Sequence, residues 1–225
     1  MITIGNFSPS PSTAAYRAVV FDMDGVLADS EPLYFEIERA SFARYGITLG
    51  EAEQHAFVGV SLEEMWRTIK ERYGLEPSLD TLLANHQRSV LEAVAAHTSL
   101  QPIPESAAFI RWLKTRGYRI AVASSSPIAL IHLLLGQIGC LRDFDIIASG
   151  EEVKHSKPAP DVFLLAAERL GVPASECLAI EDSHNGVKAA KAAGMQVAGF
   201  RNPNSGNQDL TPADWIVTDY SRFMI

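Results

Sequence analysis

Residues 18–26 read AVVFDMDGV, and this stretch decides how the rest of the chain is interpreted. An apolar run of strand length, Ala18 to Phe21, is followed by Asp22, Asp24 and Gly25. Buried parallel strands have such runs, and open α/β sheets bind ligands beyond the carboxyl ends of their strands. Side chains two positions apart in an extended chain face the same way, so the two carboxylates are expected to converge. Such a pair needs a cation or a shared proton, which indicates catalysis; an ordinary Asp-Gly turn is the alternative.

The composition is that of a globular protein and excludes several classes. The 225 residues are 47% hydrophobic and 20% charged, with a net charge of -8, which argues against nucleic acid or an anionic membrane as a partner. The longest apolar block, Ile128 to Leu135, contains His132 and is far shorter than the roughly 20 residues of a membrane span. Cys140 and Cys177 both lie in apolar surroundings, which predicts buried thiols and a reducing, cytoplasmic location.

Three regions differ in sequence pattern. Residues 1–15 contain a Ser-Pro-Ser-Pro-Ser run and are expected to form a disordered tail. Residues 31–100 carry apolar side chains at helical spacing with no clear strand, which predicts an inserted helical cap domain. Residues 16–30 and 101–225 form the predicted core domain, in which strands and helices alternate after Pro104. This alternation predicts an α/β fold with a doubly wound parallel sheet, similar to a Rossmann fold.

Polar residues follow several of the predicted strands. Asp22 and Asp24 follow the first strand, Ser124 to Ser126 follow the strand that starts at Arg119, and Glu181-Asp182 follow the strand that starts at Cys177. Lys157 lies in the loop after a further strand. Four separate elements therefore place polar side chains at one edge of one sheet.

These residues resemble the four ordered motifs of the haloacid dehalogenase-like hydrolases. The motifs are Asp22-Met23-Asp24-Gly25-Val26, Ser124, Lys157-Pro158-Ala159-Pro160-Asp161, and Glu181-Asp182-Ser183-His184-Asn185-Gly186. Within the superfamily, the chain is most similar to the β-phosphoglucomutase and sugar-phosphatase branch with a helical cap. The resemblance implies a hydrolase that transfers a phosphoryl group to an aspartate.

The resemblance also implies a role for each residue. Asp22 would attack phosphorus and form an aspartyl phosphate, and Asp24 would act as acid and then as base. Ser124, with Ser125, Ser126 and the neighbouring backbone N–H groups, would bind phosphoryl oxygens. Lys157 would bridge Asp22 and the phosphoryl group.

Mg²⁺ is the implied cofactor. Its ligands would be an Asp22 carboxylate oxygen, the Asp24 backbone carbonyl and Asp182, with Glu181 binding directly or through water. The alternative for Glu181-Asp182 is a pair of acids at a helix start.

The cap positions expected nearest the substrate are Glu31, Tyr34, Gly59 and Val60. For His86, an exposed helix position is the favoured interpretation. The connections near Ser30 and Leu100 would let the cap close over the substrate.

Two enzyme activities remain open. The favoured function is a Mg²⁺-dependent phosphatase for a small phosphorylated metabolite, with a sugar phosphate as the expected substrate. The alternative is a phosphosugar mutase. The mutases that this chain resembles hold the second phosphate of their substrate with an arginine directly after a Gly-Val-Ser turn. Here Leu62 follows Gly59-Val60-Ser61. A signalling receiver and a catalytically silent binding protein are weaker alternatives. A monomer is the default expectation.

Overall fold

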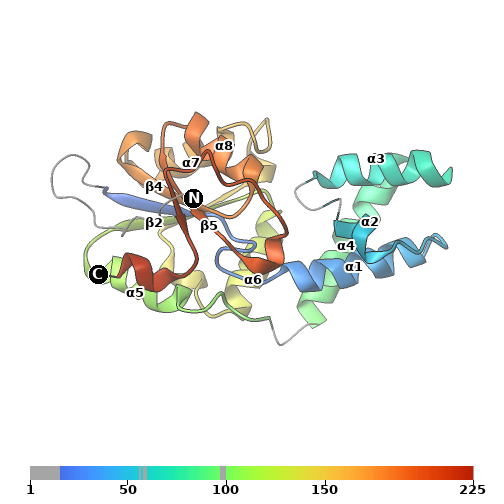
Figure 1. The fold of residues 1–225 in the computed structure, drawn as a ribbon, viewed down its shortest axis with the longest axis horizontal. Coiled ribbons are helices and arrows are strands. Elements are labelled where there is room, and N and C mark those ends of the chain that lie inside the picture. Colours follow the sequence, from blue (N-terminus) through green and yellow to red (C-terminus); the bar gives the residue numbers. More distant parts are fainter. Residues whose placement is uncertain (1–15, 56, 58–59, 97–99, 225) are drawn as a thin grey trace. The chain divides into compact units, whose positions relative to one another are not determined.

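The computed structural model describes residues 16–55, 57, 60–96 and 100–224, and the chain divides into two compact units (Figure 1). The core unit joins the segment that ends at Asp29 to the segment that begins at Leu100. The cap unit begins at Ser30 and ends before Leu100. The predicted tail, residues 1–15, lies outside the described residues.

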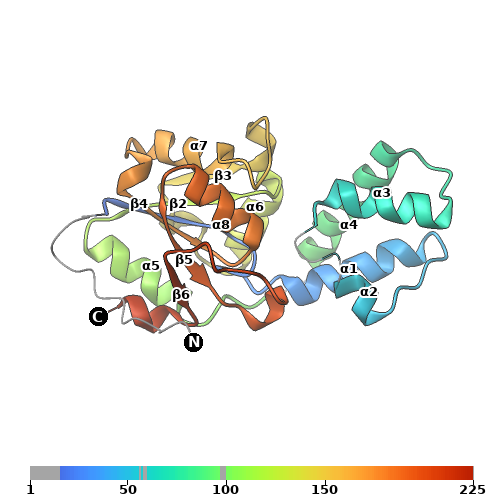
Figure 2. The same cartoon turned by 45° about the horizontal axis from the view of Figure 1, so that its top comes forward.

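A six-stranded parallel sheet forms the centre of the core unit (Figure 2). Its strands are β1 (Ala18–Phe21), β2 (Arg119–Ser124), β3 (Ile146–Ser149), β4 (Cys177–Glu181), β5 (Gln196–Phe200) and β6 (Trp215–Val217). Their order is β3-β2-β1-β4-β5-β6, so the direction of winding reverses between β1 and β4. The predicted doubly wound fold is confirmed, and a ligand site is expected at this switch point.

Strand β1 is the most enclosed part of the sheet. It pairs with β2 on one side and β4 on the other, and all four of its residues are at most 2% exposed. Val20 packs into an apolar cluster with side chains of the helices on one face, while the Phe21 ring meets Phe109 and Phe144 edge-on. A strand buried on both faces needs apolar residues at every position, which explains the unbroken run.

Four helices flank the sheet: α5 (Ser106–Thr115), α6 (Ile128–Gln137), α7 (Asp161–Leu170) and α8 (His184–Ala192). In Figure 1, α7 and α8 lie above the sheet and α5 and α6 lie below it. Short 3₁₀ helices occur at Leu141–Asp143, Gly150–Glu152, Ala174–Glu176, Pro203–Ser205 and Tyr220–Phe223. Helix α7 ends at Gly171, whose φ of 64° gives the left-handed C-cap that glycine favours.

The cap unit is built from helices: α1 (Glu31–Ala43), α2 (Glu51–His55), α3 (Leu62–Tyr73) and α4 (Leu79–Ala96). No strand occurs in its described residues, as the helical spacing predicts. Its apolar cluster gathers Phe42, Ile47, Leu49, Met65, Trp66, Ile69 and Leu82. The Trp66 ring is the centre of this cluster, because Phe42, Tyr45 and His86 each meet it edge-on.

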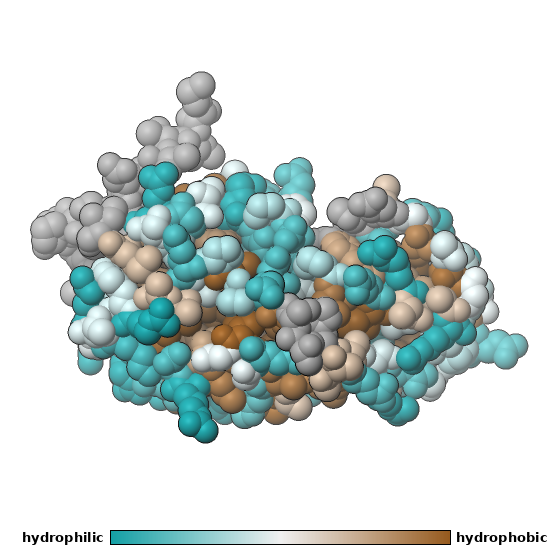
Figure 3. Space-filling view, turned by 90° about the horizontal axis from the view of Figure 1, so that it is seen from below, coloured by the Kyte–Doolittle hydropathy of each residue, from teal (hydrophilic) through white to brown (hydrophobic). Residues whose placement is uncertain are grey.

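The two thiols are buried, as predicted, and the surface visible in Figure 3 is mixed in hydropathy. On the face in Figure 3, hydrophilic residues are spread over both units, with apolar residues visible between them. Cys140 and Cys177 are free and buried. No helix in the described ranges is both long and apolar enough to cross a membrane.

Candidate active site

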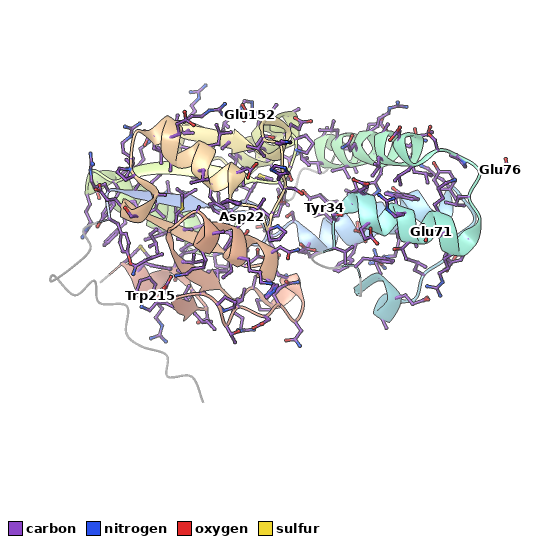
Figure 4. All side chains as sticks on the ribbon, turned by 90° about the horizontal axis from the view of Figure 1, so that it is seen from above. Asp22, Tyr34, Glu71, Glu76, Glu152 and Trp215 are labelled. Atoms are coloured by element: carbon purple, nitrogen blue, oxygen red, sulfur yellow. The ribbon has the colours of Figure 1, made fainter. Side chains whose placement is uncertain are left out.

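The carboxyl ends of three neighbouring strands hold the acidic and hydroxyl residues. Asp22 directly follows β1. Ser124 and Glu181 are the last residues of β2 and β4, because each of these strands extends one residue further than predicted. The Asp22 backbone N–H donates to the Ile180 carbonyl at 2.9 Å, which fixes the start of the loop against β4. Figure 4 labels Asp22 at this edge of the core unit.

Lys157 joins the first strand to the fourth. Its Nζ lies 2.6 Å from Asp22 Oδ1 and 2.8 Å from Glu181 Oε1, and only 8% of its side chain is exposed. Burial alone disfavours the ammonium, but the charges and hydrogen bonds of the two carboxylates outweigh it and raise the pKa of Lys157 above its ordinary value. Lys157 is therefore a permanent positive charge between two acids.

The pKa of the Asp22 carboxyl group is subject to opposing effects. This pKa is raised to about 7: burial is the largest cause, Lys157 acts in the opposite direction, and the charges of Glu181 and Asp24 add to the rise. One ammonium thus leaves the negative charge of this cluster only partly neutralised. An additional cation near Asp22 would favour its ionised form.

Asp24 is held by the serine segment that follows β2. Ser126 Oγ donates to Asp24 Oδ2 at 3.2 Å, and the Ser126 backbone N–H donates to Ser124 Oγ at 3.1 Å. Ser149 Oγ in turn donates to the Ser126 carbonyl at 2.8 Å. Ser124 is 1% exposed, whereas Ser125 is exposed. The Ser126 hydroxyl thus contacts the Asp24 carboxylate in this structure, and its role at the substrate stays a prediction.

The N-terminus of α6, expected to help bind a phosphoryl group, is already occupied in part. The backbone N–H of Ile128 donates to Glu151 Oε2 at 3.1 Å. Glu151 therefore satisfies one of the amides that a helix start leaves without an intrahelical partner. Sequence analysis missed this residue, because its contact joins the start of α6 to a 3₁₀ helix 23 positions away.

Asp182 lies against the turn that contains Gly25. Gly25 has a φ of 71°, and a Cβ there would overlap with Asp182 Oδ2. The Asp182 side chain is buried and accepts a hydrogen bond from Ser205 Oγ. Glycine is required at this position by both its conformation and the close approach of the carboxylate.

Glu181 uses both carboxylate oxygens within the protein. Oε1 accepts from Lys157, while Oε2 accepts from the Ser183 backbone N–H at 2.7 Å and from Ser183 Oγ at 2.9 Å. A Cβ at Gly186 would overlap with this carboxylate, so the start of α8 closes around it. Glu181 is 1% exposed and positions Lys157.

The donor chemistry fits a hard divalent cation. Asp22, Asp24, Glu181 and Asp182 supply oxygen atoms only, which are the ligands that Mg²⁺ prefers. No three His, Cys, Asp or Glu side chains of the described residues are grouped so that they alone could hold a metal ion. Two features agree with this result. Lys157 and Ser183 already bond to the carboxylate of Glu181, and one of the expected magnesium ligands is the Asp24 backbone carbonyl and not a side chain.

A group that we call the C-terminal clasp supports the loop of the two aspartates; its members are Asn202, Asn204, Ser205 and Tyr220. Asn202 Nδ2 donates to the Gly25 carbonyl at 3.0 Å, and Tyr220 OH donates to the Val26 carbonyl at 2.7 Å. Asn204 Nδ2 lies 3.0 and 2.9 Å from the two carboxylate oxygens of Asp29.

Sequence analysis missed the clasp. One signal was present, because Asn202-Pro203-Asn204-Ser205 begins two residues after β5 and is a further polar cluster at the same edge of the sheet.

The cap residues are described within their own unit. Glu31 and Tyr34 lie on the first turn of α1, and Figure 4 labels Tyr34 there. Val60 is 40% exposed, and Gly59 lies outside the described residues. The role of these four at the substrate stays a prediction.

The exposed position expected for His86 is wrong. It is 5% exposed and packs edge-on against Trp66, with ring centroids 5.8 Å apart. Burial lowers the pKa of His86 to about 4.

Known proteins resemble the chain over most of its length. Residues 16–194 match the family model described as haloacid dehalogenase-like hydrolase. The chain is 31% identical over 187 residues to fructose-1-phosphate phosphatase YqaB of Escherichia coli, covering 83% of this chain and 97% of that protein. It is 34% identical over 182 residues to a phosphorylated carbohydrates phosphatase of Thermotoga maritima, covering 80% and 82%. The crystal structure of CbbY from Rhodobacter sphaeroides in complex with phosphate superposes with a TM-score of 0.80 at 25% identity, covering 92% and 95%.

Proposed function

This chain belongs to the haloacid dehalogenase-like hydrolases and is a phosphoric monoester hydrolase, and we propose that it is a Mg²⁺-dependent phosphatase for a small sugar phosphate. The proposed reaction passes through an aspartyl phosphate on Asp22. The single observation that carries this proposal is the placement of Lys157 Nζ, 2.6 Å from Asp22 Oδ1 and 2.8 Å from Glu181 Oε1.

Asp22 is the proposed nucleophile. A carboxylate attacks a phosphate ester poorly unless positive charge offsets the repulsion between the two anions. Lys157 supplies such a charge directly at the Asp22 carboxylate. Glu181 holds Lys157 by an ion pair, and Ser183 in turn holds the Glu181 carboxylate. Attack by Asp22 would form the bond to phosphorus while the bond to the leaving oxygen breaks.

Asp24 is the proposed proton donor and acceptor. Its carboxyl group would protonate the leaving oxygen and then take a proton from the water that hydrolyses the aspartyl phosphate. The hydrogen bond from Ser126 to Asp24 Oδ2 supports this role, because it orients the carboxyl group. Ser124 and Ser125 remain the hydroxyl groups proposed to contact phosphoryl oxygens.

Asp22, Asp182 and the Asp24 backbone carbonyl are the groups proposed to hold Mg²⁺. The metal ion, when bound, would offset the negative charge of the phosphoryl group and orient it toward Asp22. Because Lys157 and Ser183 engage both oxygens of Glu181, we propose that Glu181 reaches the metal only through water. Ser205 would then orient Asp182 as a metal ligand.

The proposed substrate class rests on the relatives. The two matched phosphatases are named for fructose 1-phosphate and for phosphorylated carbohydrates. We extend the proposal to a cytoplasmic monomer in which the cap contributes Glu31, Tyr34, Gly59 and Val60 to substrate binding.

The deciding experiment measures inorganic phosphate released from a panel of sugar and other small phosphates, with Mg²⁺ and with a chelator. We expect release from at least one sugar phosphate, and we expect the chelator to abolish it. A phosphosugar mutase would instead return an isomerised hexose phosphate without releasing phosphate. Leu62 argues against the mutase, because it packs on the apolar cluster of the cap and offers no charge for a second phosphate.

A further inference from the structure

The cap unit encloses a small polar cavity among α1, α3 and α4. Its volume is about 30 Å³, and its lining includes Ser41 on α1, Arg44 directly after α1, Trp66 on α3, and His86 and Ser89 on α4. Helix α4 packs against both α1 and α3, which Figure 2 shows within the cap. All of these residues belong to the cap unit, whereas Asp22 belongs to the core unit.

Three polar atoms of this lining are buried and lack a hydrogen-bond partner among the described residues: Ser41 Oγ, Trp66 Nε1 and His86 Nδ1. The three side chains belong to residues that are 4%, 1% and 5% exposed. A buried polar group without a partner costs about 1–3 kcal/mol, and native proteins contain few of them. Three around one cavity therefore indicate a missing common partner.

The size of the cavity and the chemistry of the three atoms select that partner. The Trp66 Nε1–H group only donates, the Ser41 hydroxyl donates and accepts, and His86 Nδ1 does one or the other according to its tautomer. Water offers two donors and two acceptors, and a buried water typically makes about three hydrogen bonds. A cavity of about 30 Å³ exceeds the roughly 10–15 Å³ that one water requires.

We propose that one ordered water molecule occupies this cavity and bonds Ser41, Trp66 and His86, thereby joining α1, α3 and α4. The water would accept from Trp66 Nε1–H and use its remaining donors and acceptor for the other two atoms. It would thus provide a polar link among three helices of the cap.

An ion fits this site less well. No acidic residue lines the cavity, and the Trp66 N–H group would face a cation. An anion would bury a net charge, which is costly without a paired counter-charge. The Arg44 guanidinium already donates to Ser89 Oγ at 2.8 Å, and Arg44 is exposed.

The Ser41→Ala variant tests the proposal through the sign of its effect on stability. If the water is present, the variant removes one of its three partners, and the midpoint of thermal unfolding should fall by about 2–4 °C. If the cavity is empty, the variant removes an unpaired hydroxyl and gains helix propensity, so the midpoint would stay equal or rise. An equal or higher midpoint would overturn the proposal.

Thr68→Ala is the matched control, because it removes an exposed hydroxyl in the middle of α3 and gains similar helix propensity. Its midpoint should not fall.

A high-resolution crystal structure of the full chain, grown with bromide as the halide, provides the second measurement. We expect one water within about 2.7–3.2 Å of all three atoms. An anomalous bromide peak in the cavity, or rotated side chains that pair with one another, would contradict the proposal.

Discussion

Asp22 is a buried carboxyl group held by a backbone hydrogen bond to Ile180 on β4 and by the side chain of Lys157. The Asp22→Asn variant keeps the size and the polarity of the side chain but removes the nucleophile. We expect phosphate release to fall far more than tenfold, while the unfolding midpoint stays near or above that of the wild type, because a charge that burial opposes has been removed. Both quantities are measured on the same preparation.

Asp80→Asn is the control for Asp22→Asn, because Asp80 is an exposed carboxylate on the first turn of α4. It should keep full activity. Residual activity of Asp22→Asn within tenfold of the wild type would rule out Asp22 as the nucleophile.

His86 predicts a pH dependence of cap stability. Its pKa of about 4 in the folded protein lies below the ordinary 6.5, so protonation favours the unfolded state. This contribution to stability is complete above pH 6.5 and is lost progressively as the pH falls from 6.5 to 4. Between pH 7 and 5 the loss should be about 2 kcal/mol, from about 1.4 kcal/mol per pKa unit. Arg44 is the charged residue in the cavity lining.

The measurement for His86 is urea unfolding of the full chain at both pH values, compared with His86→Gln. Subtracting the pH dependence of the unfolding free energy of His86→Gln from that of the wild type removes the contributions of the other titrating groups. An identical pH dependence in the two proteins would contradict the assignment to His86.

At the scale of elements, the segment after β5 forms hydrogen bonds with the loops that follow β1 and β4. Ser205 donates to Asp182, and Asn202 donates to the Gly25 carbonyl. Partners of metal ligands typically contribute 10–100-fold to metal affinity or activity. We therefore expect Ser205→Ala to raise the Mg²⁺ concentration for half-maximal activity by about 10-fold or more. The rise in unfolding midpoint that Mg²⁺ causes gives a second readout.

Asn204→Ala is the control within the same 3₁₀ helix, because Asn204 contacts Asp29 and not Asp182. Its Mg²⁺ dependence should stay close to that of the wild type. An equal loss in both variants would show that the segment matters only for folding.

At the scale of the whole molecule, the core extends beyond the family match that ends at residue 194. Strand β5 pairs with β4, and Met195, Val197 and Leu210 belong to the main apolar cluster. A chain ending at Gly194 keeps every motif residue, yet it exposes the edge of β4 and part of this cluster. We expect it to lack a cooperative unfolding transition and activity, as measured by circular dichroism and phosphate release.

The sequence predicted the features that depend on neighbours along the chain. The apolar run Ala18–Phe21 predicts a strand because it is buried on both faces, and Gly25 follows it because the turn needs a positive φ. The helical cap was predicted from the spacing of side chains such as Leu33, Met65 and Trp66. The convergence of Asp22, Ser124 and Glu181 at one sheet edge follows from parallel topology.

Contacts between distant segments could not be predicted in the same way. Asn202 and Gly25 are 177 positions apart, so no local pattern joins them. The burial of His86 depends on the cap helices that surround it, since one polar residue at a helical position does not specify its face. The hydrogen bond between Ser126 and Asp24 could not be predicted without the relative positions of β1 and β2, which precede these two residues.

The interior position of β1 has a consequence for synthesis of the protein on the ribosome. Strand β1 is synthesised before β2, which begins at residue 119, and before β4, which begins at residue 177, and both must be made before its two sides are paired. The cap is contiguous in sequence and ends before Leu100, so it can fold earlier, as domains do during translation. The growing chain therefore carries an apolar strand without its neighbours until most of the protein has emerged, and this interval is when a chaperone would bind it.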